Sequence, residues 1–477
     1  MDATTEFLPR ASTGVAGLDQ VLDGGWARTR MHLLEGSPGT GKTTIALQFL
    51  LAGAKAGETG IYISLAETEQ ELRDGARSHG WEIDPSIEIF ELVPPDSVLN
   101  PDQHQSLLYS SDLELGEAVT RVFEAIERVK PQRVVIDSLS EIRLLAQSSL
   151  RYRRQILALK YYFAKHNSTV VMLDDLTGET NDRAVHSIAH SVTQLEQLAP
   201  IYGAERRRLK VAKCRGQTFR GGYHDFVIGP GGIQVFPRLV AADQRKGFTG
   251  DLVKSGLPAL DKLVGHGLPA GSSTLAIGPA GTGKTLLVMQ YLREAVRRGE
   301  RAAMFVFDEE LGLLFARAKG MGIDLAGMRE TGKLIIQQMD AAELSPGEFS
   351  HRVCGTVVRE DISVVAIDSL NGYQASMPEE QFLTLAQSGM VGEMKSPVDL
   401  TYLADNVIML RYFEALGRVR RAMSVIKKRG GAHEDTIREF RIDSTGIHVG
   451  DALHEFQGVL RGVPTFVGRS DTLMERT

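Results

Sequence analysis

Two stretches of the chain repeat a glycine-rich pattern that ends in a lysine and a threonine. They are Gly36–Thr43, which reads GSPGTGKT, and Gly278–Thr285, which reads GPAGTGKT. Glycines at this spacing let backbone N–H groups curl around phosphate oxygens, and the N-terminus of a following helix favours negative charge. The lysine of such a pattern reaches the β- and γ-phosphates, and the hydroxyl beside it binds Mg²⁺. We therefore expect two sites for a nucleoside triphosphate with Mg²⁺.

Each of these loops lies between a short apolar strand and a helix, which is the context that the chemistry needs. Lys42 and Lys284 are expected to act on the phosphates, and Thr43 and Thr285 are expected to bind the metal. The residues expected to contact nucleotide are Gly36, Ser37, Pro38, Gly39, Thr40, Gly41, Lys42, Thr43 and Thr44, and Gly278, Pro279, Ala280, Gly281, Thr282, Gly283, Lys284, Thr285 and Leu286. The alternative is a glycine-rich turn that binds nothing, which two occurrences in the same context disfavour.

An aspartate ends a later apolar strand in each half of the chain. Asp137 and Asp368 lie 95 and 84 residues after the lysines of their motifs. An acidic residue in this place holds Mg²⁺ directly or through water. A strand-end aspartate that caps a helix is the alternative, because Asp-Ser is also good capping chemistry. We expect the metal role for both aspartates.

Acidic residues also follow the strand that comes after each loop helix. Glu67 follows the first of these strands, and Asp308 and Glu309 follow the second. A carboxylate here can orient and polarise the water that attacks the γ-phosphate. Glu67 and Glu309 align with each other, whereas Asp308 has only Ala66 opposite it. The alternative is a solvated acidic loop without a catalytic role.

These motifs belong to a unit that occurs twice. A shift of 242 residues aligns Gly14–Asp19 (GVAGLD) with Gly256–Asp261 (GLPALD), and the same shift superimposes the two loops. The offset falls to 231 at the aspartate strands and to 214 where Lys213–Gly216 matches Lys427–Gly430. The first copy is therefore longer by about 28 residues. Part of this excess is the polar segment 94–105, which we expect to form a surface loop.

Each copy alternates strands and helices. Strands are expected at 31–35, 60–65, 134–136, 273–277, 301–307, 364–367 and 404–410, and helices at 42–55, 284–298 and 348–359. Near-continuous apolar strands separated by helices indicate a mostly parallel sheet that is covered on both faces. The expected fold class is α/β, with two tandem domains that each contain a mostly parallel twisted sheet flanked by helices.

Length and composition agree with a folded protein of several domains. The 477 residues are 43% hydrophobic and 24% charged, which excludes a mainly disordered or fibrous chain. Lys+Arg 54 against Asp+Glu 60 gives a net charge of −6, which argues against bulk polyanion binding. Two cysteines exclude a disulfide scaffold and a cysteine-rich metal site. Without a secretory signal or an apolar run of about 18 residues, a cytoplasmic protein with no membrane segment is expected.

Taken together, the repeated Gly-x-x-x-Leu-Asp motif, the two loops, the strand-end glutamates and the Lys-x-Arg-Gly stretches resemble the KaiC family. This family consists of clock-type ATPases and their non-circadian relatives, built from two RecA-like domains. The resemblance extends from about Ser12 to Pro464. It implies a first ATPase domain at 1–240 and a second ATPase and autokinase domain at 241–477. It also implies ATP as the nucleotide and a homo-hexamer with ATP held between subunits.

The resemblance assigns roles to further basic residues. Lys213 and Arg215 in the first copy, and Lys427 and Arg429 in the second, are implied to reach the γ-phosphate of the neighbouring subunit. A cation supplied in trans neutralises charge that develops in the transition state. The alternative is an edge strand made basic to prevent aggregation. Where the family has two adjacent acidic residues after the first loop helix, this chain has Ala66 and Glu67.

The family's clock members phosphorylate a Ser-Thr pair in the second domain. The corresponding pair here is Thr401 and Tyr402, so Thr401 is the expected phosphoacceptor and Ser396 the nearest alternative. Tyr402 leaves the two-site phosphorylation cycle in doubt. An ordinary strand-entry role for Thr401 is the competing interpretation.

The implied function is ATP hydrolysis at subunit interfaces with serine/threonine autophosphorylation, acting in signalling or clock-like regulation. A KaiB-like partner is possible near Ser111–Glu114, and no KaiA partner is expected because few residues follow position 465. Two alternatives stay open. One is a RecA- or DnaB-like DNA-dependent ATPase, favoured by the arginines of 151–154 and 206–208 but disfavoured by the absence of aromatic–basic interleaving. The other is a nucleotide-gated scaffold with little turnover.

Overall fold

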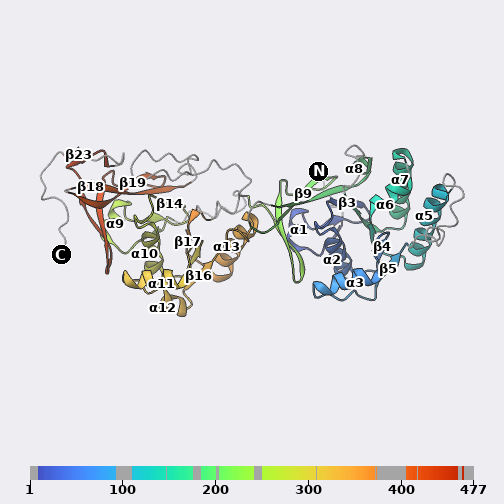
Figure 1. Cartoon of the computed structure of the whole chain (residues 1–477), viewed down its shortest axis with the longest axis horizontal. Coiled ribbons are helices and arrows are strands. Elements are labelled where there is room, and N and C mark those ends of the chain that lie inside the picture. Colours follow the sequence, from blue (N-terminus) through green and yellow to red (C-terminus); the bar gives the residue numbers. More distant parts are fainter. Residues whose placement is uncertain are drawn as a thin grey trace, which may run out of the picture. The chain divides into compact units, whose positions relative to one another are not determined.

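The chain divides into two compact units, Met1–Leu239 and Val240–Thr477 (Figure 1). The computed structural model describes residues 9–92, 110–146, 148–175, 184–199, 203–240, 250–307, 309–370, 372, 404–415, 417–459 and 465–466. The segment 94–105 and residues Ser396, Thr401 and Tyr402 lie outside this part, as does Asp308.

The first unit is built on a nine-stranded sheet with the strand order β11-β10-β9-β8-β3-β7-β6-β4-β5. Its described strands are β1 (Arg10–Ala11), β2 (Trp26–Ala27), β3 (Met31–Gly36), β4 (Gly60–Ser64), β5 (Ile87–Glu91), β6 (Arg133–Asp137), β7 (Thr169–Asp174), β8 (Ser191–Leu198), β9 (Arg206–Cys214), β10 (His224–Gly229) and β11 (Gly232–Phe236). Its described helices are α1 (Ala16–Val21), α2 (Lys42–Lys55), α3 (Glu69–Ser78), α5 (Ser110–Val129), α6 (Leu139–Ala146), α7 (Ser149–Lys165) and α8 (Ala184–Ile188). The six strands from β8 to β5 run parallel, and β9, β10 and β11 are antiparallel additions.

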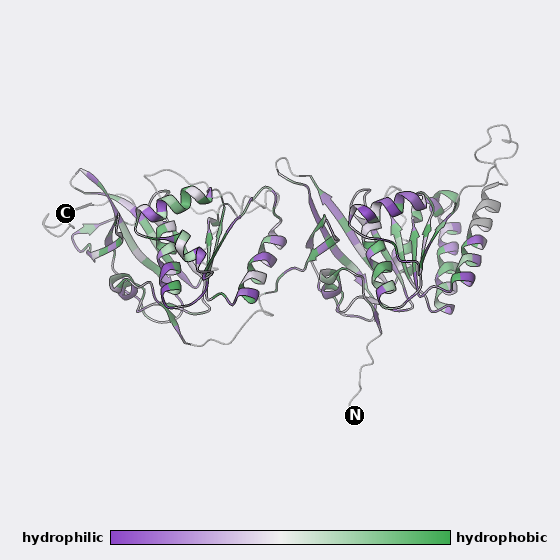
Figure 2. Ribbon diagram, turned by 90° about the horizontal axis from the view of Figure 1, so that it is seen from below, coloured by the Kyte–Doolittle hydropathy of each residue, from purple (hydrophilic) through white to green (hydrophobic). Residues whose placement is uncertain are grey.

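Alternate residues of the parallel strands enter two different cores, because successive side chains of a strand point to opposite faces. Leu34 packs with the apolar faces of α1, α2 and α3, whereas its neighbour Leu33 packs with α5, α6 and α7. Figure 2 shows this arrangement as hydrophobic strands between helices whose outer faces are hydrophilic. The expected α/β class with a mostly parallel sheet is confirmed.

The second unit has two larger sheets, β16-β15-β17 and β14-β18-β19-β20-β21, and two small sheets, β12-β13 and β22-β23. Its described strands are β12 (Leu252–Val253), β13 (Leu268–Pro269), β14 (Thr274–Ile277), β15 (Ala302–Val306), β16 (Leu334–Gln338), β17 (Val364–Asp368), β18 (Asn406–Ala415), β19 (Arg418–Lys428), β20 (Arg438–Asp443), β21 (Gly446–Ala452), β22 (Phe456–Gln457) and β23 (Thr465–Phe466). Its described helices are α9 (Pro258–Leu263), α10 (Lys284–Arg297), α11 (Leu311–Gly320), α12 (Leu325–Glu330) and α13 (Pro346–Glu360).

The two larger sheets of the second unit differ from the nine-stranded sheet of the first unit at one strand position, that of β7. In the first unit β7 lies between β3 and β6, and the described part of the second unit has no strand that joins β14 to β17. Val365 and Ile367 of β17 are 38% and 41% exposed, whereas the equivalent residues Val134 and Ile136 of β6 are buried. The unbroken sheet is therefore seen only in the first unit.

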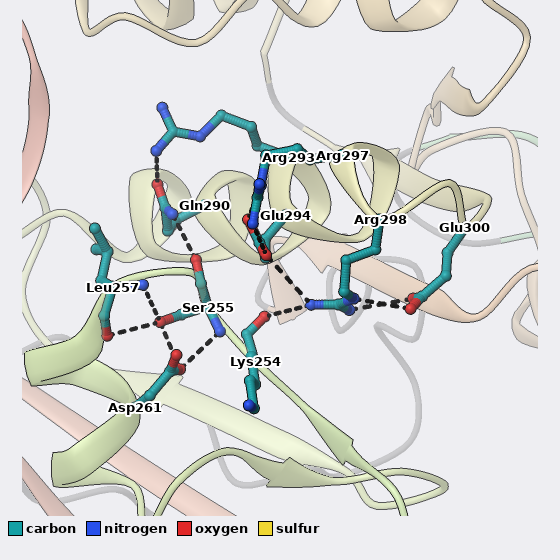
Figure 3. Close-up of polar contacts among 10 residues, drawn as sticks. All are labelled: Lys254, Ser255, Leu257, Asp261, Gln290, Arg293, Glu294, Arg297, Arg298 and Glu300. Atoms are coloured by element: carbon teal, nitrogen blue, oxygen red, sulfur yellow. Dashed lines mark hydrogen bonds and ion pairs between the residues drawn. The ribbon is translucent and has the colours of Figure 1, made fainter.

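The repeated Gly-x-x-x-Leu-Asp motif ties the start of each unit to its loop helix. Asp261 Oδ1 accepts hydrogen bonds from the backbone N and the Oγ of Ser255, both at 2.7 Å, and Gln290 of α10 donates to the Ser255 carbonyl at 2.5 Å (Figure 3). In the first unit Asp19 Oδ1 accepts two equivalent bonds of 2.7 Å from Thr13. The aspartate of the repeated motif therefore has a structural role in each unit, since it holds the backbone and hydroxyl of the residue six positions before it.

We predict that Asp19→Ala destabilises the first unit by about 2 kcal/mol, because it leaves the fully buried Thr13 donors without their carboxylate. Both tryptophans, Trp26 and Trp81, lie in the first unit, so urea unfolding followed by tryptophan fluorescence reports on that unit. The matched variant Asp261→Ala removes the same bonds from the second unit and should leave this transition in place. An unchanged midpoint for Asp19→Ala would contradict the role given to this carboxylate.

Candidate functional site

The first phosphate loop connects β3 to α2 at the carboxyl edge of the parallel strands. Gly41 precedes α2 with φ 95°, in the left-handed region. A Cβ atom built there would lie 2.8 Å from Ile228 and 2.9 Å from Ile233, which belong to β10 and β11. Glycine is therefore required by both the backbone conformation and the packing of the loop. The N-terminus of α2 opens directly onto the loop, as phosphate binding needs.

Lys42 is folded across this loop and is 6% exposed. Its Nζ donates to the carbonyls of Gly36 at 2.8 Å and Ser37 at 3.0 Å, and forms an ion pair with Asp175 Oδ1 at 2.7 Å. Asp175 directly follows β7, so it reaches the loop from the neighbouring parallel strand. Our sequence analysis did not select Asp175. The signal was present, since Asp174 and Asp175 end an apolar run in the same way as Asp137.

One carboxylate oxygen of Asp137 accepts hydrogen bonds from two hydroxyl groups. Thr43 Oγ1 donates to Asp137 Oδ2 at 3.3 Å, and the hydroxyl of Tyr62 donates to the same atom at 2.5 Å. Burial raises the pKa of Asp137, and the nearby Asp175 raises it further while the bond from Tyr62 opposes the rise. Burial, together with Asp137, raises the pKa of the Tyr62 hydroxyl well above its ordinary value. Tyr62 is the second residue of this site that the sequence analysis missed.

The pair of Thr43 and Asp137 fits a magnesium site. Hydroxyl and carboxylate oxygens are the donors that Mg²⁺ accepts, and in nucleotide sites one or two carboxylates suffice because phosphate and water oxygens complete the shell. No group of three or more metal-binding acidic, histidine or cysteine side chains occurs among the described residues. The residues present therefore match Mg²⁺ held jointly with a phosphate ligand.

Glu67 follows β4 at the same edge of the sheet. Its backbone N–H donates to Ser64 Oγ at 3.0 Å, which fixes the turn that carries it. The residue is exposed overall. Desolvation of one side of its carboxyl raises the pKa of Glu67, and the negative charges of Asp137, Glu71 and Asp175 raise it further. Among the described residues no cation forms an ion pair with this carboxyl, which suits a proton acceptor.

The second phosphate loop has the same backbone arrangement. Gly283 has φ 106°, and a Cβ there would lie 2.6 Å from Ile442 of β20. Lys284 Nζ donates to the carbonyls of Gly278 at 2.7 Å and Pro279 at 2.9 Å. Burial lowers the pKa of Lys284, and Asp368 opposes this effect. No carboxylate of the described residues forms an ion pair with Lys284, whereas Lys42 has such a partner in Asp175.

The acidic residues of the second unit are arranged differently from Glu67. Glu309 Oε2 forms an ion pair with Arg317 of α11 at 2.7 Å. Glu310 caps α11 by accepting hydrogen bonds from the backbone of Gly312 at 2.8 Å and Leu313 at 2.9 Å. Asp368 ends β17, as expected, and no hydrogen bond joins it to Thr285 in the described contacts. The position that corresponds to Arg317 in the first unit is Gly75, which explains why Glu67 has no such partner.

The basic stretch of the first unit lies at the opposite edge of the sheet from the loop. Cys214 pairs with Ser191, which pairs with His32, four residues before Gly36. At about 3.3 Å per residue, the end of β9 is about 13 Å from the loop along the strands. Lys213 Nζ donates to the carbonyl of Ala189 at 2.8 Å, and Arg215 donates to that of Ser187 at 2.8 Å.

The second unit has the same arrangement at its basic stretch. Lys427 pairs with Val407, which lies beside Leu275 near the start of β14. Lys427 Nζ donates to the carbonyl of Ala404 at 2.8 Å, and Arg429 forms an ion pair with Asp405 at 3.2 Å. In both units the predicted γ-phosphate ligands therefore lie away from the loop of their own domain.

The arginines that would favour nucleic-acid binding are partly engaged within the first unit. Arg207 pairs with Glu205 at 3.2 Å and Arg208 with Glu196 at 2.9 Å, whereas Arg154 of α7 is exposed. Within the described ranges, no helix has the length and hydropathy required to cross a bilayer.

Comparison with known proteins agrees with the repeated site. The family model of the KaiC ATPase matches residues 11–240 and 253–396. A circadian clock oscillator protein KaiC of Parasynechococcus marenigrum is 31% identical over 97% of this chain and 94% of its own length. The circadian clock protein KaiC3 of Synechocystis sp. is 27% identical over 99% of this chain and 97% of its own length. With two RecA-like domains in tandem and a phosphate loop in each, the chain is a member of the KaiC family of ATPases.

Proposed function

We propose that the chain hydrolyses Mg²⁺·ATP between the subunits of a homo-hexamer and transfers phosphate to one of its own hydroxyl groups in the second domain. The observation that carries the hydrolytic part is the grouping of Lys42, Thr43, Asp137 and Glu67 at one edge of the first sheet. The names of the relatives, circadian clock proteins KaiC and KaiC3, support a role in clock-like regulation or signalling. The first turn of α5, which contains Ser111–Glu114, is the proposed place for a KaiB-like partner.

In the first domain the loop backbone and Lys42 bind the β- and γ-phosphates, and Thr43 and Asp137 hold Mg²⁺. Bound there, Mg²⁺ neutralises negative charge on the phosphate oxygens. Glu67 orients a water molecule and accepts its proton as the water oxygen attacks the γ-phosphorus. The bond to the β-phosphate bridging oxygen breaks, and ADP and inorganic phosphate are the products. No cation of the described residues pairs with Glu67, which supports its assignment as the proton acceptor.

The position of the basic stretches supports catalysis between subunits. Lys213 and Arg215 are separated from their own loop by the length of the parallel strands, so they serve a γ-phosphate only if a neighbour presents one. A guanidinium supplied in this way stabilises the charge of the transition state. The same reasoning applies to Lys427 and Arg429 in the second domain.

For the second domain we propose phosphotransfer to Thr401. The Glu309–Arg317 ion pair occupies one oxygen of Glu309, which leaves less of this carboxylate to orient a free water molecule than at Glu67. A hydroxyl held at about 3–3.5 Å from the γ-phosphorus needs less activation by a base than free water does, because it is already positioned for attack. The Thr401 oxygen would attack the γ-phosphorus, its proton would pass to Glu309 or Asp308, and ADP would leave.

We predict that Glu67→Gln lowers phosphate release at the first site by about 10²- to 10³-fold, because the amide cannot accept the proton. The experiment uses a Lys284→Ala background, in which the first site is the remaining one. Glu82→Gln, an exposed glutamate of the same unit, is the matched control. Because the pKa of Glu67 is raised, the rate of the Lys284→Ala protein should begin to fall on acidification at a higher pH than an ordinary glutamate would give. Full activity of Glu67→Gln would refute its role.

A second prediction concerns assembly. Arg215→Ala should weaken ATP-dependent hexamer formation more than Arg429→Ala, because Arg429 is already paired with Asp405 whereas Arg215 contacts a neutral carbonyl. Native mass spectrometry with ATP measures the ring directly, and Arg154→Ala serves as an exposed control on the same unit. Equal loss in both variants would mean that the two domains contribute alike.

A third prediction tests phosphotransfer. After incubation with Mg²⁺·ATP, intact-mass spectrometry should show one added phosphate per chain, absent in Thr401→Ala and in Glu309→Gln. Ser396→Ala is the control that separates Thr401 from the nearest alternative acceptor. If the wild-type chain releases phosphate but gains no mass, the protein is an ATPase without autokinase activity.

A further inference from the structure

Tyr62 lies in the middle of β4, and only its hydroxyl group reaches the edge of the first sheet where the phosphate loop lies. The side chain is fully buried, and its ring packs in the core that also contains Leu34 of β3 and Phe49 of α2. The hydroxyl donates to Asp137 Oδ2 at 2.5 Å. Because the close-packed core holds the ring, it also fixes the position of the hydroxyl and of the carboxylate oxygen that accepts from it.

The carboxylate of Asp137 is held by one oxygen, and its other oxygen stays available. Oδ2 accepts the bond from Tyr62 and a second bond from Thr43 Oγ1 at 3.3 Å. Among the described contacts Oδ1 accepts no hydrogen bond, so it is the oxygen left for a cation or for a water molecule bound to one. A threonine hydroxyl can donate its proton to a carboxylate and still offer a lone pair to a metal. Tyr62 is thus the outer member of an arrangement whose inner members are the two proposed metal ligands.

The second unit shows that the core does not need a hydroxyl at this position. The shift of 242 residues places Met304 opposite Tyr62, and Met304 is equally buried in the middle of β15. A thioether has no proton to donate. Asp368, the counterpart of Asp137, accepts no hydrogen bond from Thr285 in the part of the chain that the structure describes. An apolar side chain fills this place in the core as a tyrosine ring does, which indicates that the Tyr62 hydroxyl serves the site and not the packing.

We propose that Tyr62 is a positioning residue, which holds Asp137 in the orientation that binds Mg²⁺ and so strengthens metal binding at the first site. This role rests on the proposed Mg²⁺-dependent function of that site. A carboxylate that is already oriented loses less conformational freedom when a cation arrives. Hydrogen-bond partners of metal ligands commonly contribute about 10- to 100-fold to metal affinity. Tyr62 supplies such a partner at Asp137, and Met304 cannot supply one at Asp368.

Metal binding without turnover tests this role. The experiment uses the full-length Lys284→Ala protein saturated with ADP, in which the first site is the remaining one. Mn²⁺ is the probe, because it takes the same oxygen ligands as Mg²⁺ and its free form gives an electron paramagnetic resonance signal. Adding Tyr62→Phe should weaken Mn²⁺ binding by about tenfold, since the ring is kept and only the hydroxyl is lost. The affinity for ADP in EDTA should stay unchanged, because the loop and Lys42 are intact.

Tyr162→Phe is the matched control. Tyr162 belongs to α7 of the same unit, and its hydroxyl also donates to a carboxylate, Glu127 Oε1 at 3.2 Å. Glu127 belongs to α5 and not to the phosphate site. The control variant should therefore bind Mn²⁺ like the Lys284→Ala parent.

Equal Mn²⁺ affinity with and without the Tyr62 hydroxyl would overturn the proposal. So would a matching loss of ADP affinity in EDTA, which would show that the hydroxyl supports the loop as a whole. Failure of the proposed function gives a different result. A Lys284→Ala parent that binds ADP but no Mn²⁺ would refute the metal assignment itself, and the role of Tyr62 with it.

Discussion

Parallel strands end together, and this constraint organises the whole first domain. Because β3, β4, β6 and β7 point the same way, the residues that follow them meet at one edge even though they are distant in the chain. Lys42, Glu67, Asp137 and Asp175 come from four separate segments and meet there. The antiparallel strand β9 runs back across the sheet and delivers Lys213 and Arg215 to the other edge. One sheet thus has the phosphate loop at one edge and, at the opposite edge, the basic residues that we propose act on a neighbour's phosphate.

The two domains share a backbone plan but differ in charge pairing. Among the described residues, Glu67 after β4 has no ion-pair partner, whereas Glu309 in the second domain is paired with Arg317. This difference comes from one position, because Gly75 stands in the first unit where Arg317 stands in the second. The two copies therefore share the phosphate-loop pattern but differ in the residues beside it.

The elements that carry a local pattern could be predicted from the sequence. The loop helix α2 spans Lys42–Lys55 as predicted, and α10 ends within one residue of its predicted end.

Contacts that depend on strand order could not be predicted in this way. Tyr62 and Asp175 reach the site because β4 and β7 both flank β6. Asp175 follows an apolar run, as Asp137 does, but this local pattern does not reveal which strands are neighbours. The Glu309–Arg317 ion pair could have been considered from the sequence, since the two residues are only eight positions apart. Helical periodicity alone, however, does not reveal an ion pair.

The ion pair between Lys42 and Asp175 has a consequence for how the first site fills. Because Asp175 pairs with the ammonium group of Lys42, a phosphate that binds this ammonium group must displace a carboxylate from it. Ligand binding at Lys42 is then an exchange of one anion for another. The released Asp175 stands at the end of β7, just before the segment that leads to α8 and to Lys213. Arrival of the nucleotide at one edge of the sheet therefore changes the charge at the head of the segment that leads to the other edge.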